Sequence, residues 1–529
     1  MIDNLKKNFI PYSFFSFYIL IGIYLSLNNG ISHDEIHEQK NWLINSSAIK
    51  DFLQTGSFEK LISYKDKYHG VAFHYISQPI QYLIKDFVIQ INEVSSTGGL
   101  LISKHPIVFL TFSLSGIFFY LILLKIIEDK NFCLLATFVY LLYPYLFGHS
   151  HFNPKDIPFL SFWLINTFFS LRIIEDLYLN KKISPKKIIF LAFLTAFLIS
   201  IRIIGLIIII QYIISLIIYL EKTKLNSFQF IKNRSKDFFI FFIFISLFIY
   251  ILNPIFWHNP LELINSIKWM SKYPQNICTL TNGKCMYSLN LPSSYYFIWF
   301  FYKLPLIVLL GYILFPLVES KIFKSDISTI YYGTITLIAP IIIVLFVLSD
   351  VALYDELRHI LFLIPLIILT SFVNLFYFIR TKILNYLFFI VIVFFMFENI
   401  NLNPYQYTWM NSFAKFKNIE KNFEIDYWGI SNKNLQKKII DYVDKKNIEK
   451  NICIYGDLYA KEFLINKNFS CFKAYTQLDD AKIRPFFAYK NLRNVKRSNP
   501  KDCKKIWNEV YNYTFFKKEI SVGSLWYCD

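Results

Sequence analysis

Charged residues and glycine are both scarce in this sequence. Asp, Glu, Lys and Arg account for 17% of its 529 residues, whereas an average soluble domain has roughly a quarter. Only 15 residues are Gly, too few for a collagen-like chain, and no apolar heptad indicates a coiled coil. The phosphate-binding motifs G-x-G-x-x-G and G-x-x-x-x-G-K-[ST] are both missing. The composition therefore excludes an ordinary soluble enzyme, and nothing indicates a nucleotide-binding loop.

Hydrophobic residues, in contrast, form long uninterrupted runs. They make up 55% of the chain, and aromatic residues alone make up 19%. A bilayer core about 30 Å thick needs about 20 apolar residues per helix, so the runs predict an α-helical polytopic membrane protein with about eleven spans. We divide the run over 188–220 at Arg202, because a charge is costly in the middle of a bilayer. The expected spans are residues 9–29, 105–127, 131–148, 157–174, 188–202, 204–220, 238–257, 296–318, 328–348, 359–379 and 383–399.

Lys and Arg in the short loops predict the orientation of these spans. One set of loops holds 18 of them and the opposite set holds seven, which places the N-terminus in the cytoplasm. An odd number of spans then places the C-terminal region outside, in a multi-pass protein of the inner (plasma) membrane. Half of the net charge of +18 lies beyond residue 400. On that side lipid headgroups, lipid phosphates or an acidic glycan are better partners than nucleic acid.

The composition becomes polar after residue 400, which predicts a domain boundary there. Residues 1–400 are expected to form the transmembrane domain, and residues 401–529 a small extracytoplasmic α/β domain. The expected external loops of the first domain are residues 30–104, 149–156, 258–295 and 349–358. In the second we expect helices over 432–447 and 458–466, strands over 451–456, 469–475 and 484–490, and a hairpin over 510–527 around Val522-Gly523.

The seven cysteines agree with this topology. Cys133 lies within a span, and the other six lie in external segments. An even number of external cysteines is compatible with disulfides in an oxidising compartment. Cys278 and Cys285 lie in one loop and are the first candidates for a pair, closing a turn around Asn282-Gly283. Free thiols in a cysteine-poor protein are the alternative, and the pairing within the C-terminal region stays open.

A dense group of acidic and imidazole side chains follows the first span. The sequence ISHDEIHEQ places His33, Asp34, Glu35 and His37 at the membrane surface. Carboxylates there are suited to act as a general base toward a hydroxyl acceptor, or to hold a divalent cation. The alternative is a helix start, because Ser32 and Glu35 have the spacing of a capping box and acidic residues suit a first turn. The two roles are compatible.

A second polar group follows the third span, in the sequence GHSHFNPKDIP. It contains His149, His151, Asn153, Lys155 and Asp156. A lysine beside a carboxylate is the arrangement expected where a phosphate and a sugar hydroxyl are held together. The alternative is again a helix cap, since an aspartate just ahead of a proline begins many helices.

Cations recur on the same face of the membrane at Arg202 and Arg358, with His359 beside the latter. The functional interpretation of Arg358 is a ligand for a lipid-linked phosphate, and the alternative is an arginine that snorkels or pairs with Asp355. A divalent metal is a further hypothesis, because zinc or manganese could be bound by acidic residues and histidine pairs. The residues concerned are His33, His37, His149 and His151, with Asp34 and Asp156.

In their order along the chain, these motifs resemble the polytopic glycosyltransferases of the C fold (GT-C). The nearest group is family 39, which includes protein O-mannosyltransferases and lipid A aminoarabinose transferases, together with a bacterial subgroup. The resemblance covers roughly residues 1–430 and rests on Asp34-Glu35, Asn153-Pro154-Lys155-Asp156, Arg358-His359, and the stretches LPSSYY (291–296), NPYQY (403–407) and FEIDYWG (423–429).

This resemblance implies a cell-envelope hexosyl- or pentosyltransferase that takes a sugar from a polyprenyl-phosphate donor and inverts the anomeric carbon. Asp34 would be the base or acceptor-orienting carboxylate, assisted by Glu35, and Asp156 would be the second acidic residue. By position and chemistry, Asn153, Lys155, Arg202, Arg358 and His359 would bind the donor. The resemblance does not by itself require a cofactor, and the divalent metal remains a hypothesis. The acceptor stays open among lipid, glycan and protein, and the sequence specifies neither the sugar nor the carrier length.

A transporter or flippase of lipid-linked or anionic substrates is the main alternative. Such a protein would place charges inside its spans and often has repeated halves. Here the span interiors are nearly uncharged and no repeat is evident. The two functions predict different arrangements: an enzyme requires Asp34, Asp156 and Arg358 to meet at one cavity.

Overall fold

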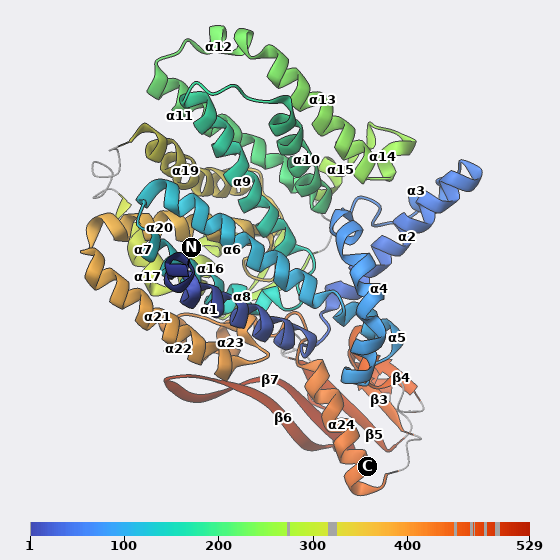
Figure 1. Cartoon of the computed structure of the whole chain (residues 1–529). Helices are drawn as coiled ribbons and strands as arrows, with labels where there is room; N and C mark the ends of the chain where they lie inside the picture. The colour runs from blue at the N-terminus through green and yellow to red at the C-terminus, as the bar shows by residue number, and fades with distance from the viewer. Residues whose placement is uncertain are drawn as a thin grey trace.

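The computed structural model describes residues 2–271, 276–315, 325–448, 452–465, 469, 471–480, 484–491 and 498–529. Most of these residues lie in helices, and a five-stranded sheet stands near the C-terminus (Figure 1). Residues 316–318 of one expected span, the last residue of the helix expected over 458–466, and residues 451 and 470 of two expected strands lie outside the described residues. The expected fold class, an α-helical polytopic membrane protein with a small C-terminal α/β unit, is confirmed.

A helix or a pair of helices occupies each of the eleven expected spans. Among the described residues, seven helices are long and apolar enough to cross a membrane, and the pair α7–α8, bent by 62°, makes an eighth. Of the other three expected spans, one corresponds to the shorter apolar helix Ser13–Leu27 within α1. The remaining two correspond to α10 and to the pair α16–α17, which are not among these candidate spans. The helices at the expected spans are α1 (Ile2–Leu27), α6 (His105–Ile127), α7 (Lys130–Leu142), α8 (Pro144–Ser150), α9 (Asp156–Tyr178), α10 (Pro185–Ile201), α11 (Ile208–Thr223), α13 (Ser235–Leu252), α16 (Ser294–Lys303), α17 (Leu306–Ile313), α19 (Asp326–Leu348), α20 (Ile364–Phe378) and α21 (Thr381–Leu402).

The long apolar run over 188–220 is interrupted where the sequence predicted. α10 ends at Ile201, and Arg202 is extended with φ −146° and ψ 129°. A short 3-10 helix, η1 (Ile203–Ile207), then leads into α11. A second 3-10 helix, η3 (Arg358–Leu363), precedes α20 in the same way. The two arginines, Arg202 and Arg358, therefore both stand where a membrane helix begins or ends.

The segment between α1 and α6 is helical and packs beside the C-terminal sheet. Figure 1 shows α5 next to β3 (Cys453–Gly456) and β4 (Cys471–Ala474). The backbone N–H of Ser95, just before α5, donates to the carbonyl oxygen of Glu462, between these two strands in the chain, over 3.1 Å. The helices of this segment are α2 (His33–Thr55), α3 (Glu59–Ile62), α4 (Ala72–Asn92) and α5 (Ser96–Ile102). The remaining connections contain α12 (Ser227–Asn233), α14 (Ile255–His258), α15 (Glu262–Ser271), β1 (Cys278–Thr281), β2 (Lys284–Tyr287), η2 (Ser288–Asn290), η4 (Gln406–Thr408), α22 (Ser412–Lys415) and α23 (Ile419–Asn422).

The C-terminal sheet has the strand order β4-β3-β5-β7-β6, with β3, β4 and β5 parallel and β7 antiparallel to β5. Helix α24 packs on it through Leu435, Ile439 and Val443, which share one hydrophobic cluster with the strands. The elements are α24 (Asn432–Lys446), β3 (Cys453–Gly456), η5 (Leu458–Phe463), β4 (Cys471–Ala474), η7 (Tyr475–Asp480), β5 (Phe486–Asn491), β6 (Lys504–Tyr513) and β7 (Phe516–Cys528).

Two details of this region differ from the sequence predictions. The second expected helix is the 3-10 helix η5, and the hairpin turns between Tyr513 and Phe516, so the turn predicted at Val522-Gly523 is wrong. Gly523 instead lies within the ladder, paired with Asn491 on one side and Glu509 on the other. A Cβ atom there would stand 2.8 Å from a methyl carbon of Leu435. The glycine is thus explained by close packing of α24 on the strand.

Three disulfides join the six cysteines outside the spans. Cys278 is bonded to Cys285 across the β1–β2 hairpin, which is the pair expected from the sequence. Cys453 is bonded to Cys471, and Cys503 to Cys528. These last two link neighbouring strands β3 and β4, and the segment before β6 with the end of β7. Cys133 is a buried free thiol.

Candidate functional site

A cavity of about 1540 Å³ lies between the membrane helices and the C-terminal sheet. Its polar wall comes from α2, from the residue just before α9, from the breaks at η1 and η3, and from the carboxyl ends of three strands. An apolar lobe continues along η1 and reaches Phe346 of α19. The predicted site residues that line this cavity are His33, Asp34, His37, Lys155, Arg202, Arg358 and His359.

Asp34 and Arg358 meet directly in the wall of the cavity. The Nη2 group of Arg358 donates to Oδ2 of Asp34 over 3.0 Å, and its Nη1 group donates to Oδ2 of Asp355 over 3.2 Å. The guanidinium also lies over two aromatic rings, 4.6 Å from the ring centre of Trp428 and 4.9 Å from that of Tyr354. Arg358 therefore pairs with Asp355, as the structural alternative suggested, and simultaneously faces the predicted base.

Asp34 keeps access to the cavity despite this pairing, because its side chain is 35% exposed. Enclosure by the protein raises the pKa of Asp34, but the positive charge of Arg358, followed by His37, Lys155 and Arg202, outweighs it. The pKa of this carboxyl therefore lies below its usual range. Asp34 is an ionised carboxylate at neutral pH, the state in which a carboxylate accepts a proton or orients a hydroxyl.

Helix geometry decides which acidic residues of α2 reach the cavity. Asp34 and Glu38 are four residues apart and lie on one face. Glu35 lies about 100° further around the helix and points inward, with its Oε1 accepting from the backbone N–H of Ser32 over 2.7 Å and its Oε2 2.8 Å from Nε2 of His105. The capping box expected from the sequence is present. Glu35 therefore positions the start of α2 and does not line the cavity.

Lys155 and Arg202 are each paired with a carboxylate. Nζ of Lys155 donates to Oε1 of Glu38 over 2.7 Å and to Nδ1 of His69 over 3.1 Å. Arg202 forms an ion pair with Asp156. Asp156 itself is buried behind the arginine, so it reaches the cavity only through that side chain. The cluster contains three cations held by carboxylates, three of which, Asp34, Glu38 and Asp355, line the same space.

Asn153 has a different place from the one expected. Its Oδ1 accepts from the backbone N–H of Asp156 over 2.9 Å, and its Nδ2 donates to Oδ2 of Asp156 over 2.9 Å. It is fully buried. Asn153 therefore fixes the start of α9 and orients Asp156 toward Arg202, and it does not face the cavity where a donor would bind.

The two predicted histidine pairs do not come together around one point. His149 and His151 are buried among aromatic rings, with His151 stacked on Phe109 at a centroid distance of 5.5 Å. His33 pairs with Asp457 of the C-terminal region. His37 instead lies beside Asp66 and His69, with His37 Nε2 3.8 Å from Asp66 Oδ2.

His37, Asp66 and His69 form a candidate metal site in the described residues, since one ligand atom from each lies within 4.8 Å of the others. Burial lowers the pKa of His69 well below its ordinary value, and the nearby Lys155 and His37 add to this effect. A neutral imidazole is the form that binds a metal. These ligands suit zinc, which accepts histidine nitrogen and carboxylate oxygen.

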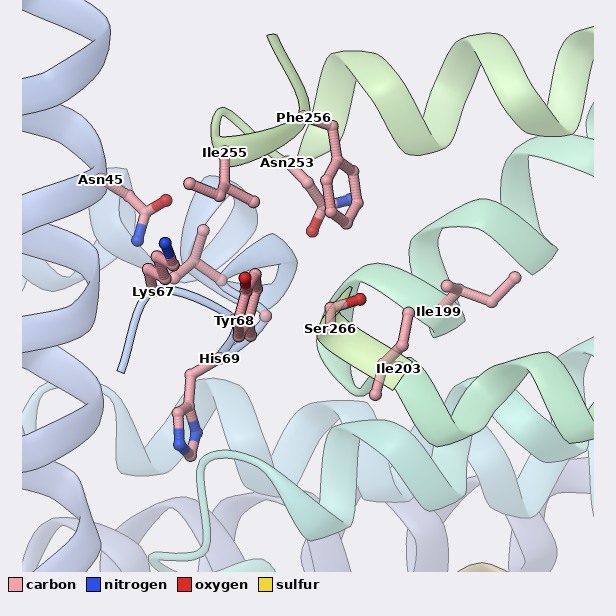
Figure 2. Close-up of a pocket in the computed structure, with 12 residues that line it drawn as sticks. Asn45, Lys67, Tyr68, His69, Ile199, Ile203, Asn253, Ile255, Phe256 and Ser266 are labelled. Atoms are coloured by element: carbon pink, nitrogen blue, oxygen red, sulfur yellow. The ribbon is translucent and has the colours of Figure 1, made fainter. Parts of the chain in front are cut away.

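A much smaller pocket adjoins this region. Figure 2 shows Asn45 of α2 on one side and Asn253 with Phe256 on the other, and Lys67, Tyr68 and His69 come from the loop between α3 and α4. Its volume is about 10 Å³, enough for about one water molecule. This pocket therefore cannot hold a substrate, and it shares His69 and Ile203 with the large cavity.

A strained turn just before η3 orients the side chain of Arg358. Asp355 and Glu356 both have left-handed backbone conformations, with φ of 55° and 66°. Thr279 of the disulfide hairpin accepts a hydrogen bond from the Asp355 backbone N–H over 2.9 Å, and Tyr295 donates to the Glu356 carbonyl over 3.0 Å. The Glu356 side chain pairs with Lys303 at 2.8 Å. Contacts from two other parts of the chain thus hold the turn in place.

Several cavity residues escaped the sequence analysis. His69 was not singled out, although it accepts a hydrogen bond from Lys155. Asp457, which directly follows β3 and lines the cavity, was also missed. A position just beyond a parallel strand is a signal that could have singled out Asp457, because ligands bind at that edge of open α/β sheets.

Two solved structures resemble the chain over almost its whole length. They are ArnT from Cupriavidus metallidurans bound to undecaprenyl phosphate, at 11% sequence identity and a TM-score of 0.46, and the same protein in the apo state, at 10% identity and a TM-score of 0.45. Each likeness covers 97% of this chain and 97% of the other. No protein-family model and no curated protein matches the sequence.

Proposed function

We propose that this protein is a membrane glycosyltransferase that moves a sugar from a polyprenyl-phosphate donor to a hydroxyl acceptor outside the cytoplasm, with inversion at the anomeric carbon. The observation that carries the proposal is the meeting of Asp34 with Arg358 in one large cavity that also contains Lys155 and Arg202. An ionised carboxylate thus stands beside three cations, next to an apolar lobe.

The three cations suit the donor's phosphate. In the reaction the bond between the anomeric carbon and the phosphate oxygen breaks, and polyprenyl phosphate leaves with the electron pair. A charged phosphate needs positive groups around it rather than a strong acid, and preorganised cations supply this stabilisation. Arg358 and Arg202 offer planar guanidinium groups that match phosphate oxygens in pairs. Lys155 adds a third charge from the same wall.

The apolar lobe suits the carrier chain. Ile203, Ile204, Leu206 and Ile207 line the cavity directly after Arg202, at the break between two membrane helices. A lipid phosphate placed against Arg202 would therefore have hydrocarbon-like side chains beside it and the bilayer beyond. The isoprenoid could stay in an apolar environment while the sugar reaches the polar wall.

Asp34 is the proposed base. The acceptor oxygen attacks the anomeric carbon from the face opposite the phosphate, and the hydroxyl proton passes to the Asp34 carboxylate. Its lowered pKa keeps the carboxylate ionised before this step, and the attack itself makes the hydroxyl more acidic. Glu35 and Asn153 have positioning roles in this proposal: the first fixes the start of α2, and the second orients Asp156.

The test is release of polyprenyl phosphate from a panel of synthetic polyprenyl-phosphate sugars by the purified protein. We expect turnover with at least one donor, and a loss of at least about 100-fold in Asp34→Asn. Asp51→Asn is the matched control, because Asp51 is on the same helix and pairs at the surface with Lys60. Equal turnover in wild type and Asp34→Asn would reject the base assignment. Donor translocation without turnover would favour a transporter.

A further inference from the structure

The cavity extends beyond the charged cluster to the C-terminal sheet. Strands β4, β3 and β5 run parallel and adjacent, and residues at their carboxyl ends line the cavity. These are Gly456 at the end of β3 and Asp457 after it, Tyr475 and Thr476 after β4, and Lys490 and Asn491 at the end of β5. Open parallel sheets bind ligands in the crevice outside the carboxyl ends of their strands. In this protein that crevice opens into the space that holds Asp34.

Direct contacts connect the sheet edge to the charged cluster. Asp457 pairs with His33, which precedes Asp34 in the chain. Asn432, at the start of α24, donates to Oδ2 of Asp457 over 2.8 Å. The backbone N–H of His33 donates to the carbonyl oxygen of Trp428 over 3.1 Å, and Trp428 lies against Arg358. The strand ends are therefore held at a fixed place relative to the proposed base.

The groups at this edge are of mixed character. Asp457 is a carboxylate, Asn432 and Asn491 are amides, Thr476 is a hydroxyl and Lys490 is an amine. The rings of Tyr475 and Tyr489 also line the space. A sugar hydroxyl both donates and accepts, so carboxylates and amides together suit it. Aromatic rings provide flat apolar surfaces for the carbon faces of a sugar ring. A purely apolar or purely anionic ligand would use only a part of this set.

The edge is also preorganised. The hydroxyl of Tyr489 donates to the backbone carbonyl of Asp457 over 3.2 Å and accepts from the side-chain amide of Gln436 over 3.0 Å. The ammonium of Lys490 donates to Asn499 over 2.8 Å. The Cys453–Cys471 disulfide joins the first residues of β3 and β4, at the amino ends of the same two strands. Side chains fixed in this way lose little freedom when a ligand binds.

We propose that the carboxyl ends of β3, β4 and β5 form the acceptor subsite, and that the acceptor is a carbohydrate. This inference rests on the proposed function, because it assumes that Asp34 activates the acceptor hydroxyl. The acceptor sugar lies against the sheet edge with one hydroxyl directed toward Asp34. The donor sugar lies between it and the three cations, so the two substrates enter from opposite ends of one cavity.

The test separates donor chemistry from acceptor binding. Without an added acceptor, water replaces the hydroxyl and slow hydrolysis releases polyprenyl phosphate. Three soluble probes are then added: a glucosamine disaccharide, a mannose trisaccharide and a serine-containing hexapeptide. We expect at least one sugar probe to accelerate the release and to become glycosylated, and the peptide to have no effect. Acceleration by the peptide alone, or by none of the probes, would overturn the inference.

Thr476→Trp is the decisive variant. Thr476 is exposed and lines the cavity, so an indole there fills the subsite without removing an internal contact. We expect KM for the sugar probe to rise at least 10-fold while donor hydrolysis stays within twofold of wild type. Asn512→Trp, at an exposed position of β6, is the matched control and should change neither.

The outcomes distinguish the two proposals. An unchanged KM in Thr476→Trp, with normal transfer, would overturn the acceptor subsite and leave the transferase intact. Absence of donor hydrolysis in wild type with every donor would reject the transferase. Lys490→Met gives an independent readout, because it keeps the length of the side chain and removes its charge. We expect it to raise KM for the sugar probe without changing donor hydrolysis.

Discussion

Arg358 donates a hydrogen bond to Asp34 over 3.0 Å, although 324 positions of sequence separate the two residues. The contact joins the start of η3, which is one end of the candidate span Arg358–Phe378, to the start of α2. It gives the carboxylate a low pKa and places a cation beside it. In the proposed reaction the same guanidinium exchanges part of its contact with Asp34 for the donor phosphate.

Arg358 should therefore be more sensitive to substitution than a surface arginine. We expect Arg358→Gln to lower kcat/KM for donor turnover by roughly 100- to 1000-fold, the usual effect of removing one preorganised group that stabilises charge. Arg358→Lys should recover only part of this loss, because lysine keeps the charge without the planar fork and the stacking on Trp428. Arg380→Gln, at an exposed position beyond α20, is the control. Similar rates for Arg358→Gln and wild type would contradict the role.

The pH profile should reflect the lowered pKa of Asp34. The ionised form is required, and its fraction falls as the pH drops through that pKa. Because the charge of Arg358 and its neighbours places this pKa below the ordinary carboxyl range, kcat/KM should stay level down to about pH 4. In Arg358→Gln, burial still raises the pKa of Asp34, but the largest charge that opposes this effect is gone. The acid limb of the kcat/KM profile should therefore move to higher pH. A wild-type limb near pH 6 would argue against Asp34.

Local patterns in the sequence were enough to find much of this cluster. Asp34, Lys155, Arg202 and Arg358 each stand next to the end of an apolar run, where charges in a membrane protein are expected. The break of the helix at Arg202 followed from the same argument and is confirmed. Helical periodicity, had it been applied to α2, would also have separated Asp34 from Glu35.

The contribution of the C-terminal region was beyond such patterns. His33 and Asp457 are 424 positions apart, and their contact depends on how the sheet packs against α2. The turn predicted at Val522-Gly523 was wrong for a similar reason. Position 523 is a glycine because Leu435 packs closely against it, and not because the chain bends there. Tertiary contacts of this kind leave no local mark in a single sequence.

The buried ion pair below the site should matter for stability. Lys303 and Glu356 are 2.8 Å apart and neither side chain is exposed. Removing one partner of such a pair typically costs 3–5 kcal/mol, since it leaves an unpaired buried charge. We expect Lys303→Met to lower the free energy of unfolding by about 3 kcal/mol, measured by denaturant titration in detergent. The double variant Lys303→Met/Glu356→Leu should regain most of it. An unchanged single variant would contradict the pairing.

The carboxyl group of Glu356 should also make the stability of the protein depend on pH. Burial raises the pKa of Glu356 to about 7, partly opposed by Lys303. The folded protein therefore holds this proton where the unfolded chain has released it, and the contribution of Glu356 to stability falls as the pH rises from about 4.5 to about 7. Glu356→Gln, which has no proton to release, should flatten this part of the stability profile.

The group formed by His37, Asp66 and His69 leads to a prediction about metal. We expect added Zn²⁺ to remain bound after dialysis, with the bound amount falling to background in His37→Ala and His69→Ala and unchanged in His258→Ala. Transfer should persist in EDTA, because Lys155, Arg202 and Arg358 already supply positive charge to the phosphate. Loss of activity in EDTA, with recovery on adding Zn²⁺ or Mn²⁺, would instead give the metal a role in the reaction.

Gly429 should be essential for the position of Asp34. Its backbone is left-handed, with φ of 74°, and a Cβ atom on it would stand 2.7 Å from Nε2 of His33 and 2.8 Å from Nδ2 of Asn432. Gly56, at the end of α2, has nearly the same φ of 73° but nothing within 4 Å of the corresponding point. The two glycines therefore differ in their surroundings and not in their backbone.

This pair isolates the effect of the contact. Gly56→Ala should cost only the strain of a left-handed residue, about 1 kcal/mol, and leave kcat/KM unchanged. Gly429→Ala should carry the same strain and also push His33 away from Asp457, which moves Asp34 relative to Arg358. We expect its kcat/KM to fall at least 10-fold, since displacement of about 1 Å can cost roughly 100-fold. Equal activity in the two variants would show that the start of α2 tolerates displacement, and that the His33–Asp457 contact is not what holds Asp34 in place.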